Sequence, residues 1–115
     1  MEDTDIHDHQ AIQKRLRRQA EAGRFRVTLH AHQEMIDEDI SIDEVREVLL
    51  DATVVENYPE HERGSCCLVC GWISRKRYIH VVCTTSLDLV IIITVYEPML
   101  PKWITPFERG KKDEM

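Results

Sequence analysis

Apolar and polar residues alternate with two different periods along this chain. In the first half, apolar residues recur every three or four positions, which is the period of a helix with one buried face. This pattern predicts helices over residues 6–22 and 29–38, and a third helix that begins with the capping box Ser41-Ile42-Asp43-Glu44. Between the first two helices, residues 25–27 alternate as a short strand does.

The second half follows a period of two, which is typical of strands. Strands are predicted over residues 53–58, 65–74, 78–84 and 89–97. No helical pattern of useful length separates them, which favours an antiparallel meander over parallel βαβ units. We therefore predict an α+β fold, in which N-terminal helices pack on one face of a four- to five-stranded antiparallel sheet.

The length of 115 residues fits a single domain with one modest core. Residues 1–23 hold the N-terminal helix, and residues 104–115 form a C-terminal tail. The segment PMLPKWITPF leads into this tail and contains three prolines, so it is expected to leave the sheet ladder. Trp103 and Phe107 are expected to anchor it to the body of the protein.

The third and fourth predicted strands decide where polar side chains gather. An odd-length loop, such as Thr85-Ser86-Leu87, would align the apolar positions of both strands on the face that the helices cover. That apolar set is Ile79, Val81, Cys83, Leu89, Ile91, Ile93 and Val95. The opposite face would then carry His80 together with Tyr78, Thr94 and Tyr96.

The net charge of −6 argues against a chain-wide attraction to nucleic acid. Residues 1–64 carry 16 acidic and 8 basic side chains, whereas residues 65–115 carry 5 acidic and 7 basic ones. A phosphate-binding surface is therefore expected on the sheet, although Arg15, Arg17 and Arg18 give the first helix a basic edge.

No segment is apolar for long enough to span a membrane, and the acidic start MEDTDIHDHQ lacks the apolar stretch of a secretory signal. A cytoplasmic protein with reduced cysteines is expected.

Three of the four cysteines lie in the segment GSCCLVCGW, at positions 66, 67 and 70. A structural zinc site needs a turn that brings both sulfurs of a CxxC pair inward, and this pair has no turn-forming residue inside it. In a strand, Cys67 and Cys70 point to opposite faces, and Cys66 lies about 13 Å from Cys70. The cluster is therefore interpreted mainly as packing, with a metal site or a redox role as alternatives.

Two histidines are candidates for chemistry. His30 precedes Glu34 by one helical turn, so the carboxylate can orient the imidazole; alternatively, His30 is only bonded to backbone at the helix start. His80 is either a satisfied core histidine or part of a site with Tyr78, Thr94 and Tyr96. Imidazole, phenol and nearby guanidinium groups suit metal-independent RNA cleavage, which needs a base, an acid and a cation.

The ordered segments HAHQEM, DEDIS, VVENYPEHERGSCCLVCGW, RYIHVVCTT and IIITVYEPMLPKW resemble the bacterial domain-of-unknown-function family 4258. The resemblance runs from about Arg26 to Trp103 and leaves the first helix outside. This family looks related to the small α+β ribonucleases of the RelE- and BrnT-type toxins. Its members are often encoded beside a YgiT-type zinc-finger, helix-turn-helix protein, which would be the antitoxin.

The resemblance also implies site residues. His30, His80 and the segment Thr94–Pro98 match the helix-start histidine, the strand histidine and the terminal TVYEP of the family. Many relatives carry arginine where this chain has Glu34, a departure that weakens a phosphate-binding role for this helix. RelE-like ribonucleases use a tyrosine and cations on the sheet and near the C-terminus; Tyr96, Lys102 and Arg77 are the nearest equivalents here.

The leading hypothesis is a toxin of a type II toxin–antitoxin pair, acting as a metal-independent endoribonuclease on mRNA, in solution or at the ribosome. It needs no cofactor; its catalytic residues would be His80, His30 and Tyr96, and its substrate-binding residues Arg77, Lys102 and Thr94. A second hypothesis is an inactive relative or interaction module that binds a partner through a sheet edge or the segment PMLPKW. A third is a thiol or metal sensor that uses Cys66, Cys67, Cys70 and Cys83.

Overall fold

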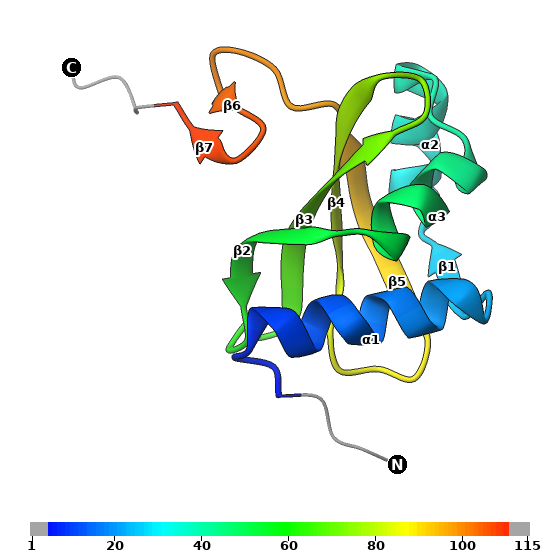
Figure 1. Ribbon diagram of the computed structural model, residues 1–115, viewed down its shortest axis with the longest axis vertical. Helices are drawn as coiled ribbons and strands as arrows, with labels where there is room; N and C mark the ends of the chain where they lie inside the picture. The colour runs from blue at the N-terminus through cyan, green and yellow to red at the C-terminus, as the bar shows by residue number, and fades with distance from the viewer. Residues whose placement is uncertain (1–4, 111–115) are drawn as a thin grey trace.

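Three helices cover one face of a five-stranded sheet in the computed structural model, which describes residues 5–110 (Figure 1). The helices are α1 (His9–Glu21), α2 (Leu29–Glu38) and α3 (Ile42–Leu50). The sheet strands are β1 (Phe25–Val27), β2 (Thr53–Tyr58), β3 (Cys66–Ile73), β4 (Arg77–Thr84) and β5 (Val90–Tyr96), and a small hairpin is formed by β6 (Trp103–Thr105) and β7 (Glu108–Arg109). The predicted α+β class is confirmed.

Side-chain caps fix the beginnings of the helices. The Thr28 Oγ1 accepts from the amide of Ala31 at 3.1 Å, and Ser41 and Glu44 form the predicted reciprocal capping box at 3.1 and 2.9 Å. The first helix starts later than expected, because the carboxylate of Asp8 accepts from the amides at the helix start. None of the helices within residues 5–110 combines the length and apolar character needed to cross a bilayer.

The strands lie in the order β1-β5-β4-β3-β2. Strands β2 to β5 form the predicted antiparallel meander, but β1 runs parallel to β5, so the sheet is mixed and the expectation of a purely antiparallel sheet was wrong. β1 lies between α1 and α2 along the chain, and a strand of three residues carries no pattern that encodes its direction in the sheet.

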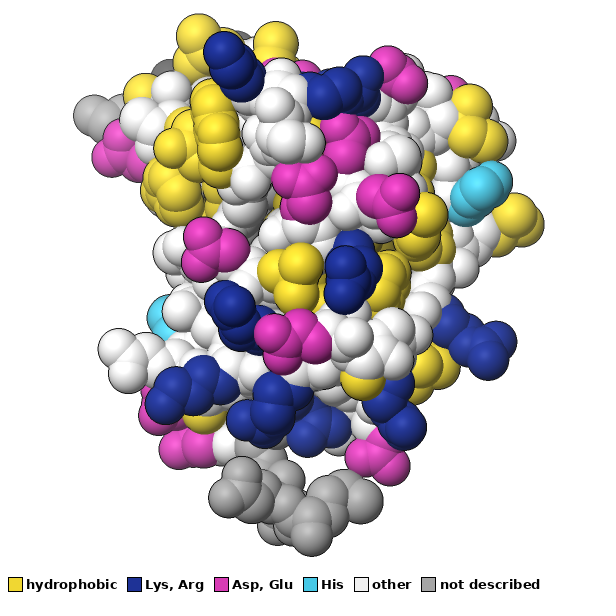
Figure 2. Space-filling view, turned by 45° about the vertical axis from the view of Figure 1, so that its right-hand side comes forward, with side chains coloured by type: hydrophobic (Ala, Val, Ile, Leu, Met, Phe, Trp, Pro, Cys, Tyr) yellow, Lys and Arg dark blue, Asp and Glu magenta, His cyan; other side chains and the backbone are white. Residues whose placement is uncertain are grey.

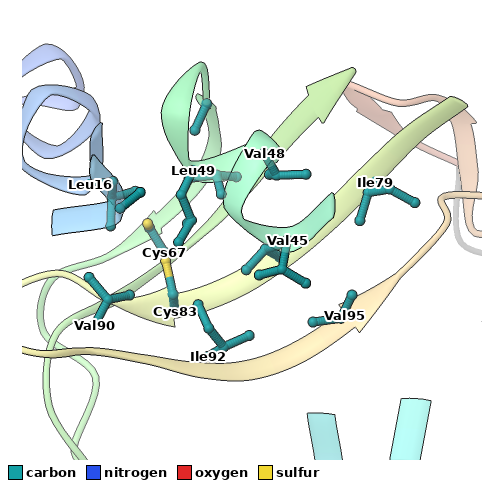
Figure 3. Packing of buried hydrophobic residues seen from close by; sticks show 14 of the residues in the cluster. Leu16, Val45, Val48, Leu49, Cys67, Ile79, Cys83, Val90, Ile92 and Val95 are labelled. Atoms are coloured by element: carbon teal, nitrogen blue, oxygen red, sulfur yellow. The ribbon is translucent and has the colours of Figure 1, made fainter. Parts of the chain in front are cut away.

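A bulge in β5 changes which of its residues face the helices. Val82 pairs with Thr94, but the next residue, Cys83, pairs with Ile92, so Ile93 is extra. Val90, Ile92 and Val95 therefore join the buried cluster under the helices, as Figure 3 shows. The prediction that Ile91 and Ile93 face the helices was wrong, whereas that for Val95 is confirmed. The connection between β4 and β5 spans residues 85–89.

Strand β3 is buried on both of its faces. Cys67, Val69 and Ile73 belong to the core cluster beneath the helices. Leu68 and Cys70 point the other way, and only 2% and 1% of their surface is exposed. The segment that follows β5 folds back toward this second face, where Trp103 is buried as predicted and Phe107 packs on Tyr78 with ring centroids 5.6 Å apart.

Helix α3 packs closely against the backbone of β3 at Gly71. A Cβ atom at this position would lie 2.8 Å from the Cα of Val48 and 3.0 Å from its Cγ1. Because a backbone atom is the nearest neighbour, the contact cannot be relieved by a side-chain rotation. The absence of a side chain at residue 71 therefore sets the spacing between α3 and the sheet.

We predict that Gly71→Ala lowers the free energy of unfolding by about 1–3 kcal/mol, because α3 must move away from β3. Urea denaturation followed by circular dichroism measures this. Val48→Ala removes one of the contacted atoms, so the double variant should lose less than the sum of the two single variants. Strict additivity of the two losses would contradict a direct contact.

Candidate functional site

The imidazole of His80 is completely buried on the sheet face opposite the helices. Its Nδ1 lies 3.0 Å from the hydroxyl of Tyr96, the residue directly opposite in the β4–β5 pairing. Its Nε2 lies 2.6 Å from the carbonyl oxygen of Pro106. A carbonyl oxygen only accepts, so Nε2 carries the proton and Nδ1 accepts from the phenol of Tyr96.

Residues 103–109 form a cover over His80. The Trp103 and His80 rings are nearly perpendicular, in a T-shaped contact with ring centroids 4.4 Å apart. Arg109 binds the carboxylate of Glu56 through two contacts, one of them 2.9 Å long, and its guanidinium lies 4.7 Å from the centre of the Trp103 ring. The hydroxyl of Tyr58 also donates to Glu56. This Glu56–Arg109 pair ties the C-terminal cover to β2.

Burial controls the protonation of this group of residues. Burial lowers the pKa of His80, which keeps its imidazole neutral, although the Pro106 carbonyl partly opposes that effect. Burial also raises the pKa of Tyr96, so the phenol keeps its proton. The hydrogen bonds from Arg109 lower the pKa of Glu56. The result is a neutral imidazole–phenol pair next to a charged carboxylate–guanidinium pair.

A small pocket reaches the other side of Tyr96. It has a volume of about 340 Å³, and its walls come from α2, the end of β5 and the segment before β6. Lys102 lies in the same wall, with its Nζ 5.7 Å from the centre of the Tyr96 ring. The remaining lining residues are Glu34, Glu38, Glu97, Met99 and Trp103. The structure therefore brings His80, Tyr96 and Lys102 together, and Tyr96 separates the buried histidine from the pocket.

Two carboxylates of the pocket have a structural task. The amides of Val95 and Glu97 at the edge of β5 donate to the side chains of Glu34 and Glu38, at 3.0 and 2.9 Å. A spacing of four residues in a helix is about 6 Å, close to the spacing of two residues in a strand. An arginine at position 34 would have no acceptor atom for this bond, so the amide of Val95 depends on the carboxylate of Glu34.

The other predicted site residues lie further from this pair. Arg77 forms an ion pair with Glu97 at 3.1 Å and donates to the carbonyl of Asp39 at 2.6 Å, so its guanidinium holds the end of α2 to the sheet. Thr94 shares the sheet face of His80. His30 lies on the first turn of α2, 69% of its side chain is exposed, and its Nε2 is 3.4 Å from Glu34. The two histidines do not form one exposed site, but Glu34 links His30 to the pocket wall.

The cysteines pack inside the sheet as expected for a strand. Cys67 pairs directly with Cys83 under the helices, and the two side chains lie next to each other in Figure 3. Cys70 pairs with His80 on the opposite face. Burial raises the pKa of Cys70 to about 12, so its thiol stays protonated and unreactive at neutral pH. Within the described residues, no three His, Cys, Asp or Glu side chains are grouped so that they can hold a metal ion.

Residues 27–97 match the protein family described as "Domain of unknown function (DUF4258)". The chain belongs to this family. The match begins in β1 and ends directly after β5, so it contains His30, His80 and Tyr96 but neither α1 nor the C-terminal cover. No curated protein and no solved structure matches the chain. The relation to RelE- and BrnT-type toxins stays a prediction.

Four further residues surround His80 and were not among the predicted site residues: Glu56, Tyr58, Pro106 and Arg109. Glu56 and Tyr58 are two residues apart in a strand, so their common face was readable from the alternation. Pro106 and Arg109 carried no such signal, because they reach His80 only through the fold of the C-terminal segment.

We predict that His80 makes the protein less stable in acid. Because burial lowers its pKa below the unfolded value of 6.5, the unfolded chain binds more protons, and stability rises with pH. The contribution of His80 is complete above pH 6.5 and is lost as the pH falls below it. His80→Gln should therefore flatten the loss of unfolding free energy between pH 7 and pH 5, with His32→Gln, an exposed histidine, as the control. Equal slopes for wild type and His80→Gln would show that protonation of this ring is not coupled to unfolding.

We predict that all four cysteines resist a thiol reagent such as Ellman's reagent in the native state, because each is buried. Four thiols should react after denaturation in guanidinium chloride, and the absorbance of the released dye counts them. Rapid reaction of one thiol in the folded protein would instead favour the sensor hypothesis.

Proposed function

We propose that this protein is the toxin of a type II toxin–antitoxin pair and acts in the cytoplasm as a metal-independent endoribonuclease on mRNA. The observation that carries the proposal is the hydrogen-bonded pair of His80 and Tyr96, which lies directly behind a pocket that contains Lys102. Membership of a family expected to be related to RelE- and BrnT-type toxins supports the same conclusion.

The pair supplies acid–base chemistry although the imidazole is buried. Tyr96 accepts the proton of the attacking 2′-hydroxyl while it passes its own proton to Nδ1 of His80. The 2′-oxygen forms a bond to phosphorus, the bond from phosphorus to the 5′-oxygen breaks, and the stored proton returns through Tyr96 to this leaving oxygen. The products are a 2′,3′-cyclic phosphate and a 5′-hydroxyl. The Pro106 carbonyl accepts from Nε2 and so stabilises the transient imidazolium.

The negative charge of the RNA phosphate and of the pocket carboxylates must be compensated during the reaction. Lys102 supplies a positive charge beside Tyr96, where negative charge develops on the phosphorane. Glu34 and Glu38 accept from backbone amides and Glu97 is paired with Arg77, which offsets part of the negative charge of the three carboxylates. His30 is a second acid–base group of this proposal, because its partner Glu34 lines the pocket.

A second candidate function is a non-catalytic module that binds the antitoxin partner but does not cleave RNA. The complete burial of His80, with both ring nitrogens already bonded, favours it. Such a protein would keep the family fold and lose turnover. Removal of the Tyr96 hydroxyl distinguishes the two functions, because it should abolish RNA cleavage but leave the binding of a partner protein intact.

We expect induced expression of the wild-type protein to arrest bacterial growth and the purified protein to cleave mRNA in the presence of EDTA. Tyr96→Phe and His80→Gln should each lower the cleavage rate by about 10²–10⁴-fold, because each interrupts the proton transfer. Tyr78→Phe is the matched control, since it removes a phenol hydroxyl near His80 that takes no part in the relay.

Thermal unfolding checks that each variant is folded. Growth arrest that persists in folded Tyr96→Phe and His80→Gln would refute the catalytic proposal and favour the binding module. Relief of the arrest by the product of an adjacent reading frame, a CxxC-containing helix-turn-helix protein, would support the toxin–antitoxin pairing.

A further inference from the structure

The basic residues of this acidic protein are concentrated in one short region. Residues 14–26 contain six lysines and arginines and one acidic residue, Glu21, although the whole chain has a net charge of −6. In Figure 2, dark blue side chains gather along the lower end of the molecule, where α1 lies in Figure 1. The basic edge that Arg15, Arg17 and Arg18 give the first helix is therefore part of a longer basic stretch that also includes Lys14, Arg24 and Arg26.

Helix α1 carries four of these cations, and three of them, Lys14, Arg17 and Arg18, are exposed to solvent. Ile12, Leu16 and Ala20 are completely buried against the protein body. Lys14 and Arg18, one turn apart, lie at the centre of the opposite side and are exposed. We call Lys14, Arg15, Arg17 and Arg18, together with Arg24 after the helix, the α1 cationic face.

A shallow pocket lies on each flank of this face. Arg15, Arg18 and Arg24 line one of about 240 Å³, together with Gln19 and Asp88. Lys14 and Arg17 line the other, of about 280 Å³, together with Gln10, Gln13, Leu50, Asp51 and Ala52. One pocket thus has three guanidinium groups around it, and the pocket on the other side of α1 has two further cations. This arrangement matches two rows of negative charge, one on either side of α1.

The cations on the flanks are held in place, and those at the centre are available. Arg15 donates to the Leu87 carbonyl at 2.6 Å, and Arg17 donates to the Leu50 carbonyl at 3.0 Å. Neither Lys14 nor Arg18 has a side-chain hydrogen bond or ion pair within residues 5–110. The carboxylates that face the group are Glu21 and Asp88, which lie 3.5 and 3.8 Å from Arg17 and Arg15, and Asp51 at the edge of the second pocket.

From this arrangement we infer that α1 is a docking surface for the sugar-phosphate backbone of base-paired RNA. The choice of RNA rests on the proposed ribonuclease function. The wide, shallow minor groove of an A-form duplex lets a convex helix approach between two phosphate rows. A lipid surface fits less well, because α1 has buried its apolar side and keeps no large apolar residue exposed for insertion. An acidic protein fits less well for the same reason, since the face lacks an apolar centre.

The location of the surface agrees with a docking role. α1 packs on α3 and β2 and lies outside the family match, whereas the Tyr96 pocket lies between α2, the end of β5 and the segment before β6. α1 and the C-terminal hairpin occupy opposite ends of the molecule (Figure 1). RNA bound along α1 therefore leaves the pocket uncovered, and an unpaired segment next to the duplex is the part that reaches it.

The test is binding of a fluorescein-labelled 20-base-pair RNA duplex to the full chain, measured by anisotropy at several salt concentrations. Lys14→Gln/Arg18→Gln should weaken binding by at least about tenfold at 100 mM salt and reduce the slope of log K against log salt by about 2. The control Arg63→Gln/Lys76→Gln removes two exposed cations elsewhere and changes the net charge equally, so it should alter affinity by less than about twofold. Lys14→Arg/Arg18→Lys should bind as wild type.

Equal losses in the two double variants would overturn the inference, because they would show a response to net charge alone. Equal affinity for the duplex, for heparin and for vesicles rich in phosphatidylserine would also overturn it. The assay needs no cleavage, so the inference stands if the protein binds the duplex through α1 but never cuts RNA. Conversely, if the protein cleaves RNA but the Lys14/Arg18 variant binds and cuts like wild type, docking on α1 is refuted while the proposed ribonuclease activity is not.

Discussion

A strand that is apolar on both faces has to be covered twice, and β3 imposes this requirement on the whole protein. The helices cover its Cys67, Val69 and Ile73 side, and α3 comes so close that only glycine fits at residue 71. Leu68 and Cys70 on the other side would expose apolar surface, which water disfavours. The C-terminal segment folds back and covers this second face. Trp103 is buried against it, and the Glu56–Arg109 ion pair holds the segment to β2.

The second cover determines the chemistry of His80. Without it, the imidazole would face solvent and titrate as an ordinary histidine; beneath it, burial lowers its pKa and both ring nitrogens have partners. Tyr96 and Trp103 both contact the imidazole and line the same pocket, and Tyr96 is the one of the two that hydrogen-bonds to the ring, so phenol and imidazole form one hydrogen-bonded unit.

The boundaries of the family match divide the protein into a shared centre and two additions. The centre contains strands β2 to β5, α2, α3 and the His80–Tyr96 pair. The additions are α1, which carries the cationic face, and the C-terminal cover, which closes the sheet. Within the centre, Glu34 and Glu38 cap the amides of β5 where a neighbouring strand would otherwise pair. The carboxylates of Glu34 and Glu38 are thus held on α2 by their bonds to backbone amides of β5. The cations that remain to attract an anion are those of α1 and Lys102.

Local information in the sequence determined the helices, the strands and the common sheet face of His80 and Tyr96, because caps and alternation act over a few residues. It also determined that the cysteines lie in a strand, since CxxC without a turn cannot fold its sulfurs inward. The parallel β1, the bulge at Ile93 and the contacts of Pro106 and Arg109 were decided only by the tertiary structure. Each of these joins segments that are distant along the chain, and their pairing depends on which surfaces remain to be covered once the local elements have formed.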